Sequence, residues 1–291
     1  MKVSGFTFIR NAIKYDYPVV AAIKSILPLC QQMVVAVGNS EDETLELIKN
    51  IHPTKIKIIE TEWDDSLREG GKVLADETNK AFAAIDEDTD WAFYIQGDEV
   101  IHEKYHQEIQ QSMEKYLHQT LVDGLLFKYL HFYGSYDFVG SSSKWYAREI
   151  RIIKNKAKIY SYRDAQGFRK GNDEKLKVKA IDAYVYHYGW VKKPEAMQRK
   201  QESFHKLWHD DRWMENNIKK ADAFDYLSHI HQLQSFEGTH PKVMQQRIEE
   251  KNWKFEYNIA YNRKSFKEKI KQLLKKYLKL DFSYKNYILL D

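Results

Sequence analysis

The sequence is poor in the features that cross-link a chain or anchor it in a membrane. It has one cysteine, Cys30, among 291 residues, so an internal disulfide is impossible, as is usual in a reducing compartment. Cys30 lies in the apolar stretch SILPLCQQMVVAV, which predicts a buried structural thiol and not a nucleophile. No segment approaches the roughly 18–20 consecutive apolar residues of a membrane helix. The N-terminal MKVSGFTFIRN lacks the long apolar run and cleavage site of a signal peptide, and we therefore expect a cytoplasmic protein.

Aromatic residues, in contrast, are abundant. Hydrophobic residues make up 43% of the chain and aromatic residues 14%, with 20 tyrosines among them. This composition is sufficient for a sizeable core and differs from that of a disordered chain. Aromatic rings also line pockets that stack on sugars and nucleobases.

The positive charge of the chain is concentrated near its C-terminus. The net charge is +4, yet residues 251–291 alone hold eleven lysines and arginines against four acids. The segment FKEKIKQLLKKYLKL places apolar side chains on one face and lysines on the other, which predicts a basic amphipathic tail over 264–280. We expect it to pack on the domain; the alternative is peripheral contact with the inner face of a membrane, where a lipid-linked acceptor would lie. Because the charge is local and no recognised motif accompanies it, nucleic-acid binding is the poorer explanation.

Strand and helix patterns alternate along the first hundred residues. Apolar runs rich in β-branched and aromatic residues predict strands at 2–10, 32–37, 55–60 and 91–95. Helices are predicted between them at 18–27, 40–51 and 73–85, and Ser40 is expected to cap the second. This alternation predicts an α/β fold in which a mostly parallel sheet is flanked by helices on both faces. Ligands of such sheets bind at the carboxyl ends of the strands.

The pattern changes after residue 100. A helix is expected at 105–117, strands at 124–132 and 150–153, and polar, glycine-bearing loops at 134–143 and 162–173. Helical patterns return at 194–213 and 240–261. No repeat or low-complexity linker interrupts the chain. We therefore expect one α/β domain over 1–190, with a helical C-terminal region over 191–291 packed on it.

The strand at 91–95 ends on two adjacent acids in the sequence WAFYIQGDEV. A buried carboxylate without a partner loses its hydration, so Asp98 and Glu99 are best explained if a cation or a hydrogen-bonding ligand lies beside them. Hard divalent cations prefer carboxylate oxygen, and Gly97 lets a ligand approach the backbone closely. The alternative is an exposed loop start, where acids are common.

Four segments of the first hundred residues carry a family resemblance. In order, they are SGFTFIRNAIKYDYPVVAAIKSIL, VVAVGNSEDETLELI, GGKVLADETNKAF and WAFYIQGDEV. They resemble the first strand and helix, the "D-D-G-S-x-D-x-T" turn, the "G-x-x-x-A-x-N-x-A" segment and the "D-x-D" segment of family 2-type glycosyltransferases, whose GT-A fold binds nucleotide-diphospho-sugars. Gln96 stands at the first acid of the "D-x-D", and Gly38 with Asn39 replaces the acidic pair of the turn.

The resemblance implies the chemistry and part of the site. It implies that residues 1–190 bind a nucleotide-diphosphate-sugar and transfer its sugar, with inversion, to a hydroxyl of a glycan or glycolipid acceptor in cell-surface polysaccharide synthesis. A divalent metal, Mn²⁺ or Mg²⁺, would assist the departing diphosphate. Asp98 would bind this metal and Glu99 would assist it. The residues expected around the donor are Phe8, Arg10, Asn11, Gly38, Gln96 and Gly97.

A glycosyltransferase also needs a base that takes the proton of the acceptor hydroxyl, and a carboxylate in the second half of the chain is expected. The segment SYRDAQGFRKGNDEKL offers Asp164, Asp173 and Glu174. We favour Asp164; for each of the three, a solvated acid in a basic loop is the alternative.

His187, in AYVYHYGWVKK, is a candidate third metal ligand or diphosphate contact. The alternative is a hydrogen-bonded core or rim histidine. Four basic residues follow it: Lys192, Lys193, Arg199 and Lys200. They could face the phosphates of a donor, but we expect most of them on a solvated helix face.

Two other functions remain open. A sugar nucleotidyltransferase on the same fold would need a glycine-rich, basic phosphate loop after the first strand, which FIRNAIKYDYP lacks. A non-catalytic sugar-binding or scaffolding protein is the second, and Gln96 and Gly38, which replace acids, are the observations in its favour.

Overall fold

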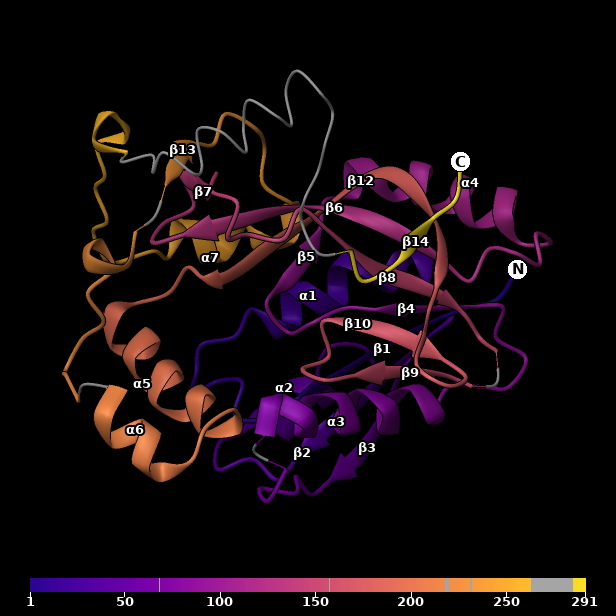
Figure 1. Ribbon diagram of the computed structural model, residues 1–291, viewed down its shortest axis with the longest axis horizontal. Helices are drawn as coiled ribbons and strands as arrows, with labels where there is room; N and C mark the ends of the chain where they lie inside the picture. The colour runs from indigo at the N-terminus through magenta and orange to yellow at the C-terminus, as the bar shows by residue number, and fades with distance from the viewer. Residues whose placement is uncertain (68, 157, 218–219, 231, 263–284) are drawn as a thin grey trace.

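A computed structural model describes residues 1–67, 69–156, 158–217, 220–230, 232–262 and 285–291 (Figure 1). The basic amphipathic tail expected at 264–280 lies outside these residues. Within them, every helix is too short or too polar to cross a lipid bilayer.

The first 94 residues alternate between strand and helix, as the sequence predicts. The strands are β1 (Val3–Ile9), β2 (Gln32–Gly38), β3 (Ile56–Thr61) and β4 (Trp91–Tyr94), and the helices are α1 (Val19–Ile26), α2 (Thr44–Lys49) and α3 (Lys72–Ala83). The four strands are parallel and lie in the order β3-β2-β1-β4. Their carboxyl ends therefore meet at one edge of the sheet. The predicted α/β fold class, with the Rossmann-like half expected of a GT-A domain, is confirmed.

Helices cover both faces of this parallel sheet. Ile23 of α1, Ile48 of α2 and Ile109 of α4 (His106–Tyr116) belong to one buried apolar cluster. Val73 of α3 belongs to a second cluster together with Phe6 of β1. Successive side chains of a strand point to opposite faces, so the two clusters are the two sides of one sheet.

The second half of the chain extends the sheet with mixed pairing. β8 (Arg148–Lys154) pairs antiparallel with β4, and β6 (Gly124–Tyr133) pairs antiparallel with β8. The long strand β12 (Lys177–Trp190) runs parallel to β6 and antiparallel to β5 (Glu99–Ile101). Three short strands complete the sheet: β7 (Phe138–Gly140), β13 (Leu233–Ser235) and β14 (Ile288–Leu289). This pairing brings the end of β12 beside the residues that follow β4.

The segment 162–173, expected to be a loop, contains a strand. β9 (Ile159–Tyr162), β10 (Gly167–Lys170) and β11 (Glu174–Lys175) form a small antiparallel sheet that contacts α3. Arg163 and Ala165, between β9 and β10, have φ angles of 55° and 61°. Residues with side chains rarely adopt this left-handed conformation, and positions 163–166 hold neither glycine nor asparagine, so no such residue marks the turn in the sequence.

The prediction that Ser40 caps the second helix is wrong. α2 begins at Thr44, and the backbone N–H of Thr44 donates to Oδ1 of Asp42 at 3.0 Å. The Ser40 hydroxyl instead accepts the backbone N–H of Asn11 at 3.0 Å and joins the turn after β2 to the turn after β1.

The C-terminal region is less helical than its pattern suggests. The expected helix at 194–213 is divided into α5 (Pro194–Phe204) and α6 (Asp211–Asn217), which Figure 1 shows on the side of the molecule away from both termini. Within 240–261, the α-helical part is α7 (Gln245–Glu249). The aromatic residues of this stretch pack against buried apolar clusters: Trp253 packs against one, and Phe255 and Tyr257 pack against another. The Trp253 indole also donates to the carbonyl of Gly134 at 2.8 Å.

Candidate active site

A cleft of about 2540 Å³ opens at the carboxyl ends of β1 and β4, between the sheet and α5. Among the described residues, eleven lysines and arginines and six acidic residues line it, so its walls carry a net positive charge. The sequence-predicted residues on its wall are Phe8, Arg10, Asn11, Gln96, Gly97, Asp98, Asp164 and His187. A positively charged cleft at this edge of the sheet suits an anionic ligand.

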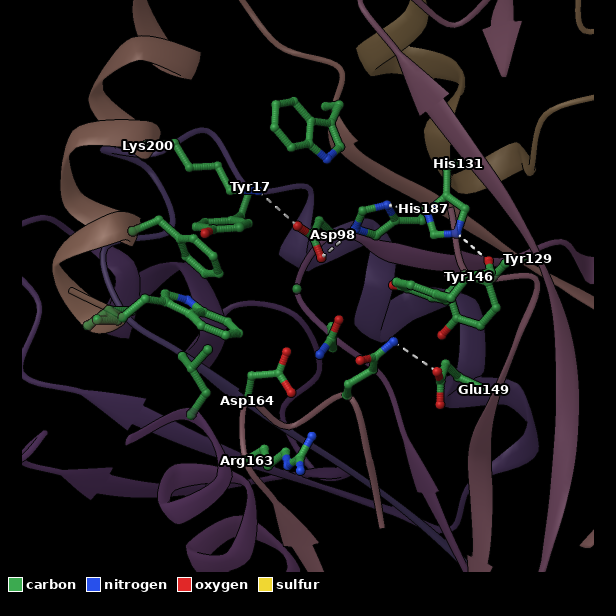
Figure 2. A pocket seen from close by; sticks show the side chains of 18 of the residues that line it. Tyr17, Asp98, Tyr129, His131, Tyr146, Glu149, Arg163, Asp164, His187 and Lys200 are labelled. Carbon is green, nitrogen blue, oxygen red and sulfur yellow. Dashed lines mark hydrogen bonds and ion pairs between the residues drawn. The ribbon is translucent and has the colours of Figure 1, made fainter. Parts of the chain in front are cut away.

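Asp98 lies in the cleft between His187 and Lys200 (Figure 2). Its carboxylate Oδ1 lies 3.7 Å from Nε2 of His187, and its Oδ2 lies 3.2 Å from Nζ of Lys200. The backbone N–H of Tyr188 donates to the carbonyl of Asp98 at 2.8 Å, and this bond holds the end of β12 against Asp98. Burial alone would raise the pKa of Asp98, but the positive charges of Lys200 and its neighbours lower it well below the usual range, so Asp98 is ionised.

A chain of hydrogen bonds fixes the tautomer of His187. Nε2 of His131 faces the carbonyl of Tyr146 at 2.8 Å and must carry the proton of that bond. Burial lowers the pKa of His131 to about 3, so His131 is neutral and its Nδ1 is an acceptor. The Nδ1 of His187, 3.1 Å away, therefore donates. Burial also lowers the pKa of His187, which leaves its Nε2 with a free lone pair facing Asp98.

Gly189 makes room for this arrangement. A Cβ atom added at Gly189 would lie 2.6 Å from Oδ2 of Asp98 and 2.7 Å from Nε2 of His187, closer than real Cβ contacts allow. A carboxylate and an imidazole lone pair thus converge over a residue without a side chain. Carboxylate oxygen and imidazole nitrogen are both ligands of divalent metals, so these two residues fit a metal ion. No group of three or more histidine, cysteine or acidic side chains suited to a metal occurs among the described residues, so further ligands would come from a bound substrate or water.

Glu99 does not take part in this metal pair, because its carboxylate is already bound. Arg151 donates to both of its oxygens at 2.7 Å, and Tyr129 donates to Oε1 at 2.7 Å. The backbone N–H of Gln96 donates to Oε2 at 3.1 Å. Glu99 therefore serves as a buried anchor for the turn that carries Asp98, and the geometry does not favour it as a metal ligand.

Gln96 joins the end of β4 to the loop that carries the candidate base. Its side-chain amide donates to the carbonyl of Ala165 at 3.3 Å. The neighbouring Asp164 faces the same space as Asp98 from the opposite wall in Figure 2. Burial raises the pKa of Asp164, which makes the carboxylate a stronger base than an exposed one.

The other two candidate bases lie elsewhere. Asp173 and Glu174 are exposed at the far end of the small sheet, and neither is among the described residues that line the cleft. Asp173 accepts the hydroxyl of Tyr160 at 3.0 Å.

The end of β1 meets an aromatic wall that the sequence did not predict. A Cβ atom at Gly38 would lie 2.3 Å from Nε1 of Trp63, so glycine there admits the indole ring. The Trp63 ring lies 5.8 Å from the ring of Phe8, and the Arg10 guanidinium lies 5.5 Å from its centroid. Gly38 is not among the described residues that line the cleft. It leaves room for the ring of Trp63, which does line the cleft.

The side-chain oxygen of Asn11 is already hydrogen-bonded within the protein. Asn11 is buried with a φ of 55°, and its Oδ1 accepts the backbone N–H of Glu41 at 2.7 Å. This contact holds together the two turns at the edge of the sheet.

Sequence reasoning misplaced Lys192 and Lys200 and missed Glu149. The expected solvated position holds for Lys193 and Arg199, which are exposed. It is wrong for Lys192, which is fully buried, and for Lys200, which is 9% exposed. Nζ of Lys192 donates to the carbonyls of Tyr15 and Asp16 at 2.7 and 3.1 Å. The helical periodicity of α5 could have shown that Lys200 shares a face with the buried Ala196 and Met197.

Glu149 is a buried acid in the cleft wall. Gln166 donates to its Oε1 at 2.9 Å, and Oε2 has no hydrogen-bond partner in the described part of the chain. Burial raises the pKa of Glu149 to about 8. Nothing in the sequence AREIRI distinguishes this acid from one on an exposed strand face.

Comparison with known proteins gives only distant likenesses. No family model and no curated protein matches the chain. Among solved structures, TarS from S. aureus is matched at a TM-score of 0.43 and 15% identity over 70% of this chain and 39% of that one. Glucosyl-3-phosphoglycerate synthase from Mycobacterium tuberculosis, in complex with Mn²⁺, uridine diphosphate and phosphoglyceric acid, is matched at 0.31 and 15% over 45% of this chain and 43% of that one. 4-Diphosphocytidyl-2C-methyl-D-erythritol synthase from Anaerococcus prevotii is matched at a TM-score of 0.33 and 9% identity, over 53% of this chain and 71% of that one. The chain thus spans well under half of the full TarS chain, and likenesses of this size assign no activity.

Proposed function

We propose that the protein is a glycosyltransferase that moves a sugar from a nucleotide-diphosphate-sugar to a hydroxyl group of a glycan or glycolipid. The observation that carries the proposal is the meeting of Asp98, His187 and Asp164 in one positively charged cleft at the carboxyl ends of β1 and β4. The sequence resemblance to family 2-type glycosyltransferases supports it as well: it lies within segments of residues 1–100, Asp98 included, and involves neither His187 of β12 nor Asp164 of the loop after β9.

The donor would lie along the edge of the sheet. Trp63 and Phe8 offer aromatic surface for the base, and Arg10 offers positive charge beside them. The diphosphate would lie near Asp98 and His187, which would hold a divalent metal between them. When bound, such a metal supplies positive charge to the departing diphosphate.

Asp164 would act as the base on the acceptor. It takes the proton of the acceptor hydroxyl while that oxygen forms a bond to the anomeric carbon of the sugar. The bond between that carbon and the diphosphate oxygen breaks, and the nucleoside diphosphate leaves with both electrons. Attack opposite to the leaving group inverts the anomeric configuration. The raised pKa of Asp164 favours this proton transfer.

The direct test is release of nucleoside diphosphate from a panel of nucleotide sugars in the presence of Mn²⁺. We expect the wild-type protein to hydrolyse at least one donor slowly without an acceptor, and faster with a suitable glycan. Asp164→Asn should lower the rate by about 10²-fold or more, as loss of a general base does. Asp173→Asn is the matched control, because this exposed acid lies in the same segment but outside the described cleft lining. Equal rates for the wild type and Asp164→Asn would reject Asp164 as the base, and no turnover of any donor by the wild type would favour a non-catalytic sugar-binding protein.

A further inference from the structure

The carboxylate of Asp98 already has a cation beside it, and that cation belongs to the protein. Nζ of Lys200 lies 3.2 Å from Oδ2 of Asp98 and donates to the carbonyl of Gly189 at 3.0 Å. Asp98 is 8% exposed and Lys200 is 9% exposed, so water screens this ion pair only weakly. The Tyr17 ring, 5.0 Å from Nζ, gives the ammonium a further favourable contact.

The ammonium lies beside the proposed metal ligands. Lys200 donates to the backbone of Gly189, and it is over Gly189 that the Asp98 carboxylate and the lone pair of His187 converge. A divalent ion bound to Asp98 would face the positive charge of Lys200 at close range in a poorly solvated site. The ion pair and a metal complex of Asp98 are therefore mutually unfavourable.

Lys200 is among the described residues that line the open cleft, whereas Lys192 is not. Lys192 is fully buried, and its Nζ is held by two backbone carbonyls. Lys200 is carried by α5 on a long, flexible stem and lines the open cleft. Its partners at Nζ are the same Asp98 that a metal would bind and one carbonyl of β12.

We propose that Lys200 is the resident cation of the Asp98 site: it neutralises Asp98 in the metal-free protein, competes with the divalent metal for this carboxylate, and is released into the cleft when the metal binds. This inference rests on the proposed function, because it takes Asp98 as the metal ligand. It assigns to Lys200 a role in metal affinity. The released ammonium would face the anionic diphosphate of the donor, so displacement would not leave it without an anionic partner.

The test is Mn²⁺ binding to the full chain, measured from the electron paramagnetic resonance signal of free Mn²⁺ without nucleotide. Lys200→Gln and Lys200→Met remove the competing charge, and we expect each to bind Mn²⁺ about tenfold or more tightly than the wild type. Arg199→Gln is the matched control: it removes the same charge from the neighbouring, exposed residue of α5, which also lines the cleft, and should stay within about twofold of the wild type. Combining Asp98→Asn with Lys200→Gln should abolish the gain.

Two results would overturn the proposal. One is Mn²⁺ affinity that is unchanged or weaker in both Lys200 variants, provided that circular dichroism melts show each variant folded; two variants of different polarity guard against a folding defect of one. The other is a gain in affinity that survives Asp98→Asn, because the competition would then not concern Asp98. Nucleotide-sugar hydrolysis by the wild type, measured in parallel, separates this failure from failure of the proposed function: turnover without a Lys200 effect on Mn²⁺ leaves the transferase standing and rejects only the competition.

Discussion

Arg151 and Glu99 form a doubly hydrogen-bonded ion pair in which both side chains are fully buried. The pair joins β8 to the first residue of β5, directly beside Asp98 in the chain. Arg151 also donates to the carbonyl of Gln166 at 3.1 Å, in the loop that carries Asp164. One guanidinium therefore ties together the two segments that present the proposed metal ligand and the proposed base.

Removing one member of this pair should destabilise the protein strongly. Arg151→Met leaves Glu99 buried without its counter-ion, and we expect the free energy of unfolding to fall by about 3–5 kcal/mol. Urea denaturation measures this. Lys128→Met is the control, because Lys128 pairs with the largely exposed Asp182 and its loss should change little. A stability of Arg151→Met equal to that of the wild type would show that the pair does not anchor the site.

Glu149 should make stability depend on pH. Because burial raises its pKa to about 8 in the folded protein, the folded state keeps a proton that the unfolded chain has already lost above the usual carboxyl range. The free energy of unfolding therefore falls by about 1.4 kcal/mol per pH unit between the usual carboxyl pKa and about pH 8. Above about pH 8 it levels off, because Glu149 is then ionised in both states.

Glu149→Gln keeps the shape and the Gln166 contact but cannot ionise. We expect urea denaturation between pH 5.5 and 9 to give a flatter stability profile for this variant, so that its stability relative to the wild type rises with pH. Parallel profiles for the two proteins would contradict a raised pKa at Glu149.

Gly189→Ala should damage binding through Asp98 and His187. The added Cβ would lie under 3 Å from an atom of each side chain, so both must move. We expect Gly189→Ala to lose Mn²⁺-dependent nucleotide binding, measured by isothermal titration calorimetry, and to have a lower melting temperature than the wild type. Adding His187→Ala relieves half of the crowding and should restore part of the stability but not the binding. Full metal-dependent binding by Gly189→Ala would show that the convergence over Gly189 is not the metal site.

Trp63→Ala should weaken the binding of nucleotides and spare that of pyrophosphate. Stacking of a base on an aromatic side chain contributes about 1–3 kcal/mol, so we expect nucleoside diphosphate affinity to fall by roughly 5- to 150-fold. Pyrophosphate, which has no base, is the matched probe. An equal loss for both probes would place Trp63 at the phosphates or in folding, and not at the base.

The sequence predicted the parallel half of the sheet because its signals are local. Each strand from β1 to β4 is an apolar run, and each helix between them has its own apolar period, so the alternation follows without knowledge of distant contacts. The position of Asp98 at the end of β4 follows in the same way. His187 is indicated by the Gly-Trp and Lys-Lys-Pro that follow it in the sequence, although its partner Asp98 is not.

The errors concern residues whose partners are distant in the chain. Glu99 and Arg151 are 52 residues apart, and Lys200 and Asp98 are 102 residues apart. Nothing near Glu99 indicates that an arginine will bind both of its oxygens. The period of PEAMQRKQESF indicates that Lys200 lies on the buried face of α5, but not that it will turn towards the acid that follows β4. Local patterns thus indicate the candidate site, whereas long-range pairing decides which of its charged residues already have a partner within the protein.

The most direct test of the account is thermal melting of the wild type and Asp98→Asn with a panel of nucleoside diphosphates and nucleotide sugars, each with and without Mn²⁺. A ligand that binds only the folded state raises the melting temperature by mass action. We expect one nucleotide to raise the melting temperature of the wild type, Mn²⁺ to enlarge the shift, and Asp98→Asn to lose the part that depends on Mn²⁺. The absence of any shift with any nucleotide in the wild type would contradict the proposed donor site.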